Sequence, residues 1–262
     1  MRWERAYASV FSVISVARLF SPNAVLKVDG EARSGSGSPS DRKGGMFSAV
    51  RARAYDRMMS SLELRFLGPI RDKLLRGTSG RVLEIGGGTG ANLRYYGDRV
   101  GELILCEPDG SMRKILAARA ETVLGGRCRI EPWSAEAIDL PDASCDAIVS
   151  TLVLCSVGDP AAVFAEIRRV LVPGGKLLYM EHVCPWTHPR HRRALRVIEP
   201  FWKLVAGNCH LTRATGQAME VAGFTNVRRE VAHFPRPANW VGPVIWGEAE
   251  WHPDHIASKA EA

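Results

Sequence analysis

Short apolar runs alternate with stretches of helical periodicity from about residue 46 to the end of the chain. Between Phe47 and Arg76 the apolar residues recur at three- and four-residue spacing, which predicts a helix with an interruption near Gly68-Pro69. Strand-like runs follow in the segments RVLEI and ELILC, in a third strand before Ser134, and in a fourth, CDAIVST. Three later runs complete the pattern, and the first of them, the fifth strand, ends at Glu181-His182. Strands and helices that alternate in this way predict an α/β fold around a mostly parallel sheet.

Two helices between the later strands carry clear end signals. Asp159 and Pro160 precede the amphipathic stretch AAVFAEIRRVL, and aspartate followed by proline is typical of a helix start. Thr212 is expected to cap a second helix, which Gly223 ends. The strands Phe224 to Val231 and Trp240 to Trp251 are expected to follow it.

Residues 1–45 differ in character from the rest of the chain. Apolar side chains from Trp3 to Phe20 share one helical face, which indicates an amphipathic helix lying on a surface. A secretory signal is the competing interpretation, although Arg18 interrupts the apolar core. Residues 30–45 have the composition of a flexible polar linker. We therefore expect one domain over 46–262, preceded by a separate N-terminal segment or a dispensable extension.

Composition narrows the class of protein. The 262 residues are 46% hydrophobic and 24% charged, as in ordinary globular chains. No apolar run approaches the roughly 18 residues that a membrane-spanning helix needs. Six cysteines without a CxxC pair predict reduced thiols and a cytoplasmic location rather than a disulfide framework.

The net charge of +7 comes entirely from the first 80 residues. These carry 14 Lys or Arg against 7 Asp or Glu, and the remaining residues carry 21 of each. A nucleic-acid enzyme usually spreads basic side chains around its cleft, so we expect no nucleic acid partner. A basic arm favours anionic lipid or an acidic partner. Two interpretations remain: peripheral membrane contact through residues 1–20, or a solvated arm without a partner.

The stretch RVLEIGGGTGANLRYY is the most informative part of the sequence. A short strand ends in Glu84 and Ile85, glycines follow at 86, 87, 88 and 90, and a helix is expected to begin at Ala91 and Asn92. Glycines at this place let a nucleotide or nucleoside lie against bare backbone amides. The spacing also satisfies the dinucleotide fingerprint, so glycines alone do not identify the ligand.

Two carboxylates help to distinguish the ligands. Glu84 lies two residues before the first glycine, where it would repel a pyrophosphate and attract a cation. Glu107 ends the second strand, 21 residues after Gly86, where a carboxylate can accept hydrogen bonds from ribose hydroxyls. The pair favours a positively charged nucleoside over a dinucleotide, and a dinucleotide-dependent oxidoreductase is kept as a remote alternative.

At this point the sequence resembles a known family. VLEIGGGTG, LCEPDGSM, SAEAIDLPDASCDAIVSTLVLCSV and VLVPGGKLLYMEHV, in this order, resemble the successive motifs of class I S-adenosylmethionine-dependent methyltransferases. STLVLCSV with MEHV, VIEPFWKLVAGNCHLTR and VGPVIWGEAEW resemble a narrower group, the small-thiol S-methyltransferases of animals and their bacterial relatives. The resemblance covers about Met46 to Trp251. It implies a doubly wound, Rossmann-like, seven-stranded and mostly parallel sheet with one antiparallel edge strand.

The resemblance also implies a set of cofactor contacts for S-adenosyl-L-methionine. Glu84 would lie near the ammonium of the methionine moiety, Gly86, Gly88 and Gly90 would form the turn against the cofactor, and Glu107, followed by Pro108, would hold the ribose. The adenine loop and the strand end beside the sulfonium would add four more residues: Ser134, Ala135, Glu136 and Thr151. Many relatives have an acid where this chain has Ser134, so the Ala135 backbone is the expected substitute there.

The acceptor side is expected in the loop from Leu152 to Val157 and at the end of the fifth strand. The loop is apolar, which favours a small or apolar acceptor. His182 and Glu181 are the candidate catalytic residues, and a purely structural, hydrogen-bonded role for His182 is the alternative. The neighbours of Cys155 indicate a packed thiol rather than a nucleophile.

The insertion at about residues 184–211 is longer than a simple connection and predicts a lid over the acceptor pocket. Cys184, His188 and His191 lack a fourth partner with matching spacing, so no metal site is expected. Arg190 and the three arginines after it indicate a solvated or lipid-facing helix side.

The sequence thus predicts an S-adenosylmethionine-dependent methyltransferase acting on a small, lipophilic acceptor, with a thiol favoured. At pH 7 a thiol with a pKa of about 8.5 is roughly 3% ionised, and a phenol with a pKa near 10 only about 0.1%. A chain without a dedicated base motif therefore suits sulfur better than oxygen or carbon. Methylation of a quinone-type ring or a phospholipid amine remains an alternative, as does a catalytically idle nucleoside-binding module. The oligomeric state is left open.

Overall fold

The computed structural model describes residues 62–184, 189–236 and 238–251. The predicted N-terminal segment 1–45, its membrane contact through 1–20 and the start of the predicted helix at Phe47 lie outside the described residues. The strands are β1 (Gly80–Ile85), β2 (Val100–Cys106), β3 (Arg129–Glu131), β4 (Cys145–Thr151), β5 (Leu171–His182), β6 (Phe224–His233) and β7 (Pro243–Trp251). The helices are α3 (Gly68–Leu75), α4 (Gly110–Leu124), α5 (Pro160–Val170), α6 (Pro189–Val205) and α7 (Thr215–Val221), with short turns η2 (Glu63–Leu67), η3 (Leu93–Tyr95) and η4 (Ala238–Trp240).

The strands form one seven-stranded sheet in the order β3-β2-β1-β4-β5-β7-β6. The pairs from β3 to β5 are parallel, and β7 runs antiparallel to both of its neighbours. This confirms the predicted fold class and its single antiparallel strand. That strand lies one position in from the edge rather than at it, because β6 and β7 form a hairpin whose second strand pairs with β5.

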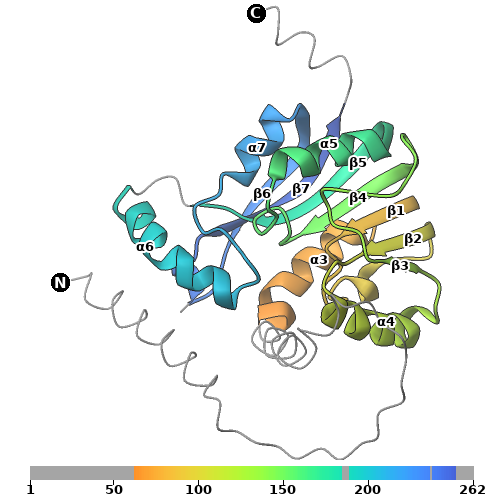
Figure 1. The fold of residues 1–262 in the computed structure, drawn as a ribbon, viewed down its shortest axis with the longest axis horizontal. Helices are drawn as coiled ribbons and strands as arrows, with labels where there is room; N and C mark the ends of the chain where they lie inside the picture. The colour runs from red at the N-terminus through yellow and green to blue at the C-terminus, as the bar shows by residue number, and fades with distance from the viewer. Residues whose placement is uncertain (1–61, 185–188, 237, 252–262) are drawn as a thin grey trace, which may run out of the picture. The chain divides into compact units, whose positions relative to one another are not determined.

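Helices cover both faces of the sheet (Figure 1). Alternate residues of β1 show how the layers form: Val82 packs with α3 and α4, and Leu83 packs with α5 and α7. Successive side chains of a strand point to opposite faces, so the mainly apolar run of β1 contributes to two cores at once. Glu84 shares the face of Val82 and therefore points toward α3. Within the described residues, no helix is both long and apolar enough to cross a bilayer.

Two helix predictions need correction. No regular helix begins at Ala91; only the short turn η3 follows the glycines, because the side chains of Asn92 and Tyr96 bond inward to Glu84. Thr212 does not cap α7, whose first residue is Thr215. Instead, the amide and the hydroxyl of Thr212 both donate to the carboxylate of Glu199 on α6, at 2.8 and 2.7 Å.

Other local signals behave as predicted. Asp159 accepts hydrogen bonds from the amides of Ala161 and Ala162 and begins α5. The predicted interruption near Gly68-Pro69 takes the form of the π-helical turn η2, which passes directly into α3. A helix turn of this kind keeps the chain helical while shifting its register.

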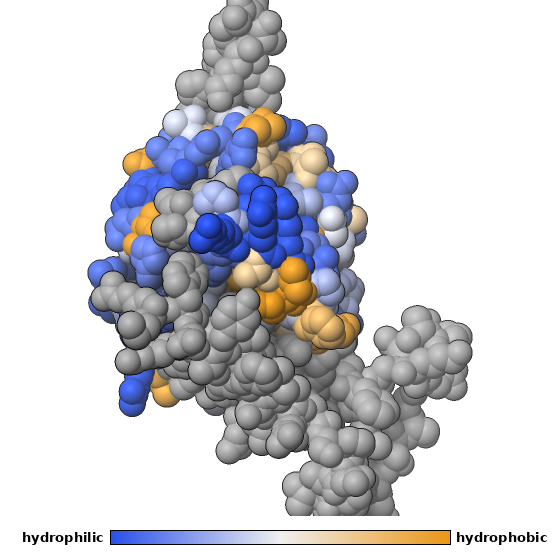
Figure 2. Space-filling view, turned by 90° about the vertical axis from the view of Figure 1, so that its left-hand side faces the viewer, coloured by the Kyte–Doolittle hydropathy of each residue, from blue (hydrophilic) through white to orange (hydrophobic). Residues whose placement is uncertain are grey.

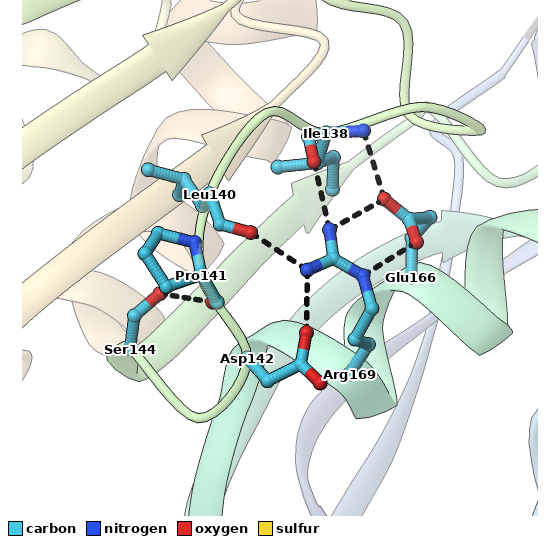
Figure 3. A network of polar contacts seen from close by, with 7 residues as sticks. All are labelled: Ile138, Leu140, Pro141, Asp142, Ser144, Glu166 and Arg169. Atoms are coloured by element: carbon cyan, nitrogen blue, oxygen red, sulfur yellow. Dashed lines mark hydrogen bonds and ion pairs between the residues drawn. The ribbon is translucent and has the colours of Figure 1, made fainter.

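Arg169 on α5 fixes the loop that leads into β4 (Figure 3). Its guanidinium donates to the carbonyls of Ile138 and Leu140, at 2.7 and 2.6 Å, and to the carboxylates of Asp142 and Glu166. Glu166 in turn accepts from the amide of Ile138 at 2.8 Å. Arg169 lowers the pKa of Glu166, which is consistent with a carboxylate held in its charged form. One arginine therefore supplies hydrogen-bond donors to the carbonyls of a loop that has no regular secondary structure of its own.

Replacement of Arg169 by Met is expected to lower the free energy of unfolding by about 2 kcal/mol, because two carbonyls and two carboxylates lose a charged donor. Arg76→Met serves as the control, since Arg76 forms only an exposed pair with Asp72 and should cost less than about 0.5 kcal/mol. Urea unfolding measures both. Equal losses in the two variants would contradict the assigned role.

Candidate functional site

A glycine corner, residues 86–90, follows β1 at the carboxyl edge of the sheet. The amide of Gly87 donates to the Cys106 carbonyl at 2.9 Å, which ties the corner to β2. Gly86 has a φ of 61°, and a side chain there would lie 2.6 Å from a methyl of Val153. Gly88 has a φ of 56° and faces open space, with no atom nearer than 3.9 Å to an added Cβ. The missing side chain at Gly88 thus leaves open space beside the corner, while its amide is bonded to Glu107.

Glu84 lies buried beneath this corner, with 3% of its surface exposed. Its carboxylate accepts hydrogen bonds from the Asn92 amide at 3.0 Å and from the Tyr96 hydroxyl at 2.6 Å. Burial raises the pKa of Glu84 to about 7, against the opposing effect of these two donors and of Arg71. A buried carboxylate with this pKa would gain from a cationic group of a ligand, which would restore its charged form.

Arg71 on α3 is the residue that the sequence reasoning missed. Its Nη1 atom donates to Asn92 Oδ1 at 2.6 Å and to Thr151 Oγ1 at 2.8 Å, so it joins the glycine corner to the end of β4. Its remaining bonds go to Glu63, at 2.8 and 2.9 Å. Arg71 is 3% exposed. A lone arginine at helical spacing gives no sequence signal for this role, because its partners lie far along the chain.

Glu107 follows β2 and holds the corner from the other side. One carboxylate oxygen accepts from the Gly88 amide at 2.9 Å, and the other accepts from the Asp109 amide at 2.8 Å. Burial raises the pKa of Glu107, and these amides partly oppose the rise. Arg113 donates to the carbonyls of Glu107 and Pro108 and fixes the turn into α4. Each carboxylate oxygen keeps a lone pair free for a hydroxyl donor.

The remaining predicted cofactor residues come to the same edge of the sheet in different ways. Thr151 ends β4, and its hydroxyl accepts from both Arg71 and Asn92. Ser134 and Ala135 lie in the loop after β3, where a backbone bridge joins Ser134 to Ala137. Glu136 accepts a bond from the Gly158 amide at 3.1 Å, so its carboxylate tethers the loop after β4.

Glu181 is hydrogen-bonded to residues 152–157, the loop after β4 that we call the acceptor loop. It is fully buried, and its carboxylate accepts from the Ser150 hydroxyl at 2.7 Å and from the amides of Val153 and Cys155 at 3.1 and 3.2 Å. Burial raises its pKa, while these donors act in the opposite direction. With its oxygens bonded to one loop, Glu181 acts as a positioning residue for residues 152–157.

His182 lies beside the buried thiol of Cys209. Its Nε2 atom lies 2.9 Å from the Val241 carbonyl, which can only accept, so Nε2 carries the proton and Nδ1 is the basic atom. Nδ1 lies 3.8 Å from Cys209 Sγ. Burial alone would lower the pKa of His182, but Cys209 and the Val241 carbonyl outweigh it and the net shift is upward.

Cys155 and Cys209 influence each other electrostatically within this cluster. The Cys155 thiol, with support from His182, lowers the pKa of Cys209 despite burial, and Cys209 in turn raises the pKa of Cys155. Cys155 is 2% exposed, as expected for the packed thiol that the sequence predicted. Cys209 was not singled out from the sequence, since its partners come from β5 and from the loop after β4.

The predicted insertion 184–211 contributes α6 and, after it, a segment that is hydrogen-bonded to the acceptor loop. Asn208 donates to the Ser156 carbonyl at 2.7 Å, and the His210 amide donates to the Cys155 carbonyl at 2.8 Å. Just beyond the insertion, Arg213 donates to the carbonyls of Leu154 and Val157, each at 2.8 Å. His191 bonds to the Trp240 carbonyl, and within the described residues no group of three potential ligands could hold a metal ion.

These residues lie along the carboxyl edge of the sheet in two chemically different groups, which form the two ends of the candidate site. One end, at Glu84 and Glu107, combines carboxylates with an open glycine backbone and suits a polar, positively charged ligand with hydroxyl groups. The other end, at the loop 152–157, is apolar and backed by the Cys155, Cys209 and His182 cluster. A separate cleft of about 510 Å³ opens at the amino-terminal ends of β2 and β3, and Tyr96 is the residue it shares with the Glu84 network.

Comparison with known sequences agrees with this arrangement. The family model of a methyltransferase domain matches residues 83–179, which include the glycine corner and the acceptor loop. The chain is 40% identical over 214 residues to thiol S-methyltransferase TMT1B of Rattus norvegicus, covering 78% of this chain and 84% of that one. It is 32% identical over 205 residues to thiol S-methyltransferase TMT1A of Homo sapiens, covering 74% and 80%.

More distant relatives share the fold. The chain is 35% identical over 170 residues to a demethylmenaquinone methyltransferase of Tropheryma whipplei, covering 61% of this chain and 63% of that one. A solved S-adenosylmethionine-dependent methyltransferase from Mesorhizobium loti superposes with a TM-score of 0.54 at 19% identity, covering 70% of this chain and 96% of that one. At that identity the likeness concerns the fold.

The buried state of Glu84 predicts a specific pH dependence of stability. Folded Glu84 keeps its proton up to about pH 7, whereas the unfolded chain releases it near 4.5. The folded state therefore binds more protons between these values, and the wild type should lose stability relative to Glu84→Gln as pH rises through this window. The relative loss should be on the order of 3 kcal/mol.

Urea unfolding of both proteins from pH 4.5 to 8 measures this difference, and the exposed substitution Glu121→Gln is the control. Parallel stability curves for the wild type and Glu84→Gln would contradict a Glu84 that is buried and protonated.

Proposed function

We propose that this chain, which belongs to the class I S-adenosylmethionine-dependent methyltransferases, methylates the sulfur of a small, lipophilic thiol. Family membership rests on identity to thiol S-methyltransferases across most of both chains. The observation that supports a thiol as the methyl acceptor is this sequence identity, since the matched length spans the acceptor loop as well as the glycine corner. The apolar loop from Leu152 to Leu154 supports an acceptor with little polar surface.

When bound, S-adenosylmethionine supplies an electrophilic methyl group on a sulfonium. Glu84 would face the ammonium of its methionine moiety, and Glu107 would accept from its ribose hydroxyls with the lone pairs that the Gly88 and Asp109 amides leave free. The open backbone at Gly88 fits such a ligand, because any side chain there would occupy the space it needs. Ser134, Ala135 and Glu136 would border the adenine.

Positioning is the main task that remains for the acceptor side. Glu181 fixes the loop 152–157 from one side and Arg213 from the other, so the loop presents a rigid apolar wall. In-line displacement at a methyl group needs the acceptor sulfur held on one axis with the leaving sulfur, and water excluded. A preformed wall provides both.

The buried cluster gives the acceptor proton a destination. Nδ1 of His182 is its basic nitrogen, and this atom faces the Cys209 sulfur. As the acceptor thiol passes its proton to Cys209, Cys209 would pass its own proton to Nδ1, which leaves the acceptor a thiolate and His182 an imidazolium. His182 would act as a proton acceptor, and Glu181 would act on the loop rather than on the proton.

A second candidate function is methylation of a quinone-type ring carbon. It is favoured by the identity to demethylmenaquinone methyltransferase, whose matched region covers 63% of that protein. A ring hydroxyl with a pKa near 10 would need a stronger base than a thiol does. The buried histidine is the one candidate base identified at the acceptor end among the described residues.

A methyl-transfer screen with isotopically labelled S-adenosylmethionine tests the acceptor class. Aliphatic and aromatic thiols, a quinol and a lipid amine are offered at equal concentration to the full chain. We expect a labelled thioether from the thiols, with rates that rise with the lipophilicity of the thiol. Label found in the quinol or the lipid amine, and none in any thiol, would contradict the proposal.

The role of His182 predicts a loss that depends on pH. Because the pKa of His182 is raised above 6.5, its basic form is present mainly at neutral pH and above. At pH 7.5 a thiol with a pKa of about 8.5 is only about 10% ionised, so loss of the base can slow turnover by at most about 10-fold. We expect His182→Ala and His182→Gln to lose activity near pH 7.5 and to approach the wild type near pH 9, where the thiol ionises unaided. Steady-state rates across this range measure the effect.

His182→Gln can still donate to the Val241 carbonyl, so it separates proton transfer from packing. His233→Ala, at an exposed position of β6, is the matched control and should leave the profile unchanged. Unchanged turnover of His182→Ala at pH 7.5 would remove the base assignment.

A further inference from the structure

Helix α6 has an inner face that is firmly attached to the fold. Leu195 is buried in the core, and His191 bonds to the Trp240 carbonyl at 2.8 Å. The rings of Trp202 and Trp240 meet edge to face, with centroids 5.6 Å apart. Glu199 accepts two hydrogen bonds from Thr212. The orientation of α6 about its own axis is therefore fixed, and so is the identity of the face it turns outward.

That outer face carries a stripe of large apolar side chains, which we call the α6 stripe: Val197, Phe201 and Leu204. Their exposed fractions are 74%, 73% and 76%. Spacings of four and three residues place all three in one line along the helix. Figure 2, which views the side of the molecule that bears α6 in Figure 1, shows hydrophobic side chains next to strongly hydrophilic ones. Single exposed apolar residues are ordinary, but an aligned row on a rigid helix points to a contact.

Basic residues accompany the α6 stripe. The helix contains five Lys or Arg and one Glu, and Arg190, Arg193 and Arg196 are exposed. On a helical projection Arg190 lies near the line of the stripe, while Arg193 and Arg196 lie along one flank. An apolar row beside arginines is the pattern of a helix that lies in the interface of a bilayer with anionic headgroups. The arginine stems can cover apolar surface while their charges reach phosphate.

We infer that α6 docks the folded domain on a lipid surface rich in anionic headgroups, with Val197, Phe201 and Leu204 entering the acyl boundary. This inference goes beyond the proposed reaction and does not depend on it. A second copy of the chain is the competing occupant. Two α6 faces in a symmetric contact would bring like arginine charges together, which is unfavourable, whereas an anionic surface neutralises them.

The test measures partition of the full chain onto vesicles of phosphatidylcholine, with and without phosphatidylserine, by flotation. The triple variant Val197→Ser, Phe201→Ser, Leu204→Ser should partition at least about 10-fold more weakly onto the anionic vesicles. Contributions of separate segments to membrane binding add as free energies, so this loss is expected whatever other parts of the chain contribute. All substituted side chains are exposed, so the thermal unfolding midpoint should not change.

Two further variants make the test specific. Arg190→Gln, Arg193→Gln, Arg196→Gln should weaken binding to the anionic vesicles alone, by about fivefold per arginine at low salt, and the effect should fade as salt rises. The control carries Val221→Ser, Val227→Ser and Val231→Ser, three substitutions of exposed valines on α7 and β6, and should bind like the wild type.

Three results would overturn the inference. One is unchanged partition of the stripe variant, and another is an equal loss in the valine control. The third is a concentration-dependent dimer in light scattering that the stripe substitutions abolish, because a second copy would then cover this face.

Discussion

The guanidinium of Arg71 is the contact on which the candidate site depends. It joins three segments that the chain brings together only on folding: α3, the segment after the glycine corner and the end of β4. Glu63 supplies its ion pair, and Asn92 passes the network on to Glu84. A buried charge without such partners would be strongly unfavourable, so the network has to form as a unit. Its completeness keeps Glu84 beneath the corner in a fixed position.

Carboxylates perform the same structural task at several other points of the fold. Glu107 holds the Gly88 amide, Glu181 holds the amides of the acceptor loop, and Glu166 holds the Ile138 amide. Glu107 and Glu181 fix irregular backbone at the carboxyl edge of the sheet, where open α/β folds bind ligands, and Glu166 fixes the loop that leads into β4. The loops of the candidate site are therefore preorganised by carboxylates rather than by regular secondary structure. A preorganised site lowers the cost of aligning two substrates.

Much of the fold could be predicted from sequence because its signals are local. The strands β1, β2 and β4 are short, mainly apolar runs, and the start of α5 follows from Asp159 and Pro160. The glycine corner and Glu107 were predictable for the same reason. The contacts of Arg71 with Thr151 and of Cys209 with His182 were not, because each joins segments that only the fold makes neighbours. Thr212 was misleading, since Glu199 on another helix competes for its amide.

The central claim is that Glu84 and Glu107 together cradle a positively charged sulfur nucleoside at the glycine corner. A crystal structure of the full chain with S-adenosylhomocysteine, the demethylated product, tests it most directly. The account predicts the product's amino group within hydrogen-bonding distance of the Glu84 carboxylate and its ribose hydroxyls on Glu107, with the backbone of Gly88 against it. A product bound elsewhere, or bound at the corner without contact to either carboxylate, would contradict the account.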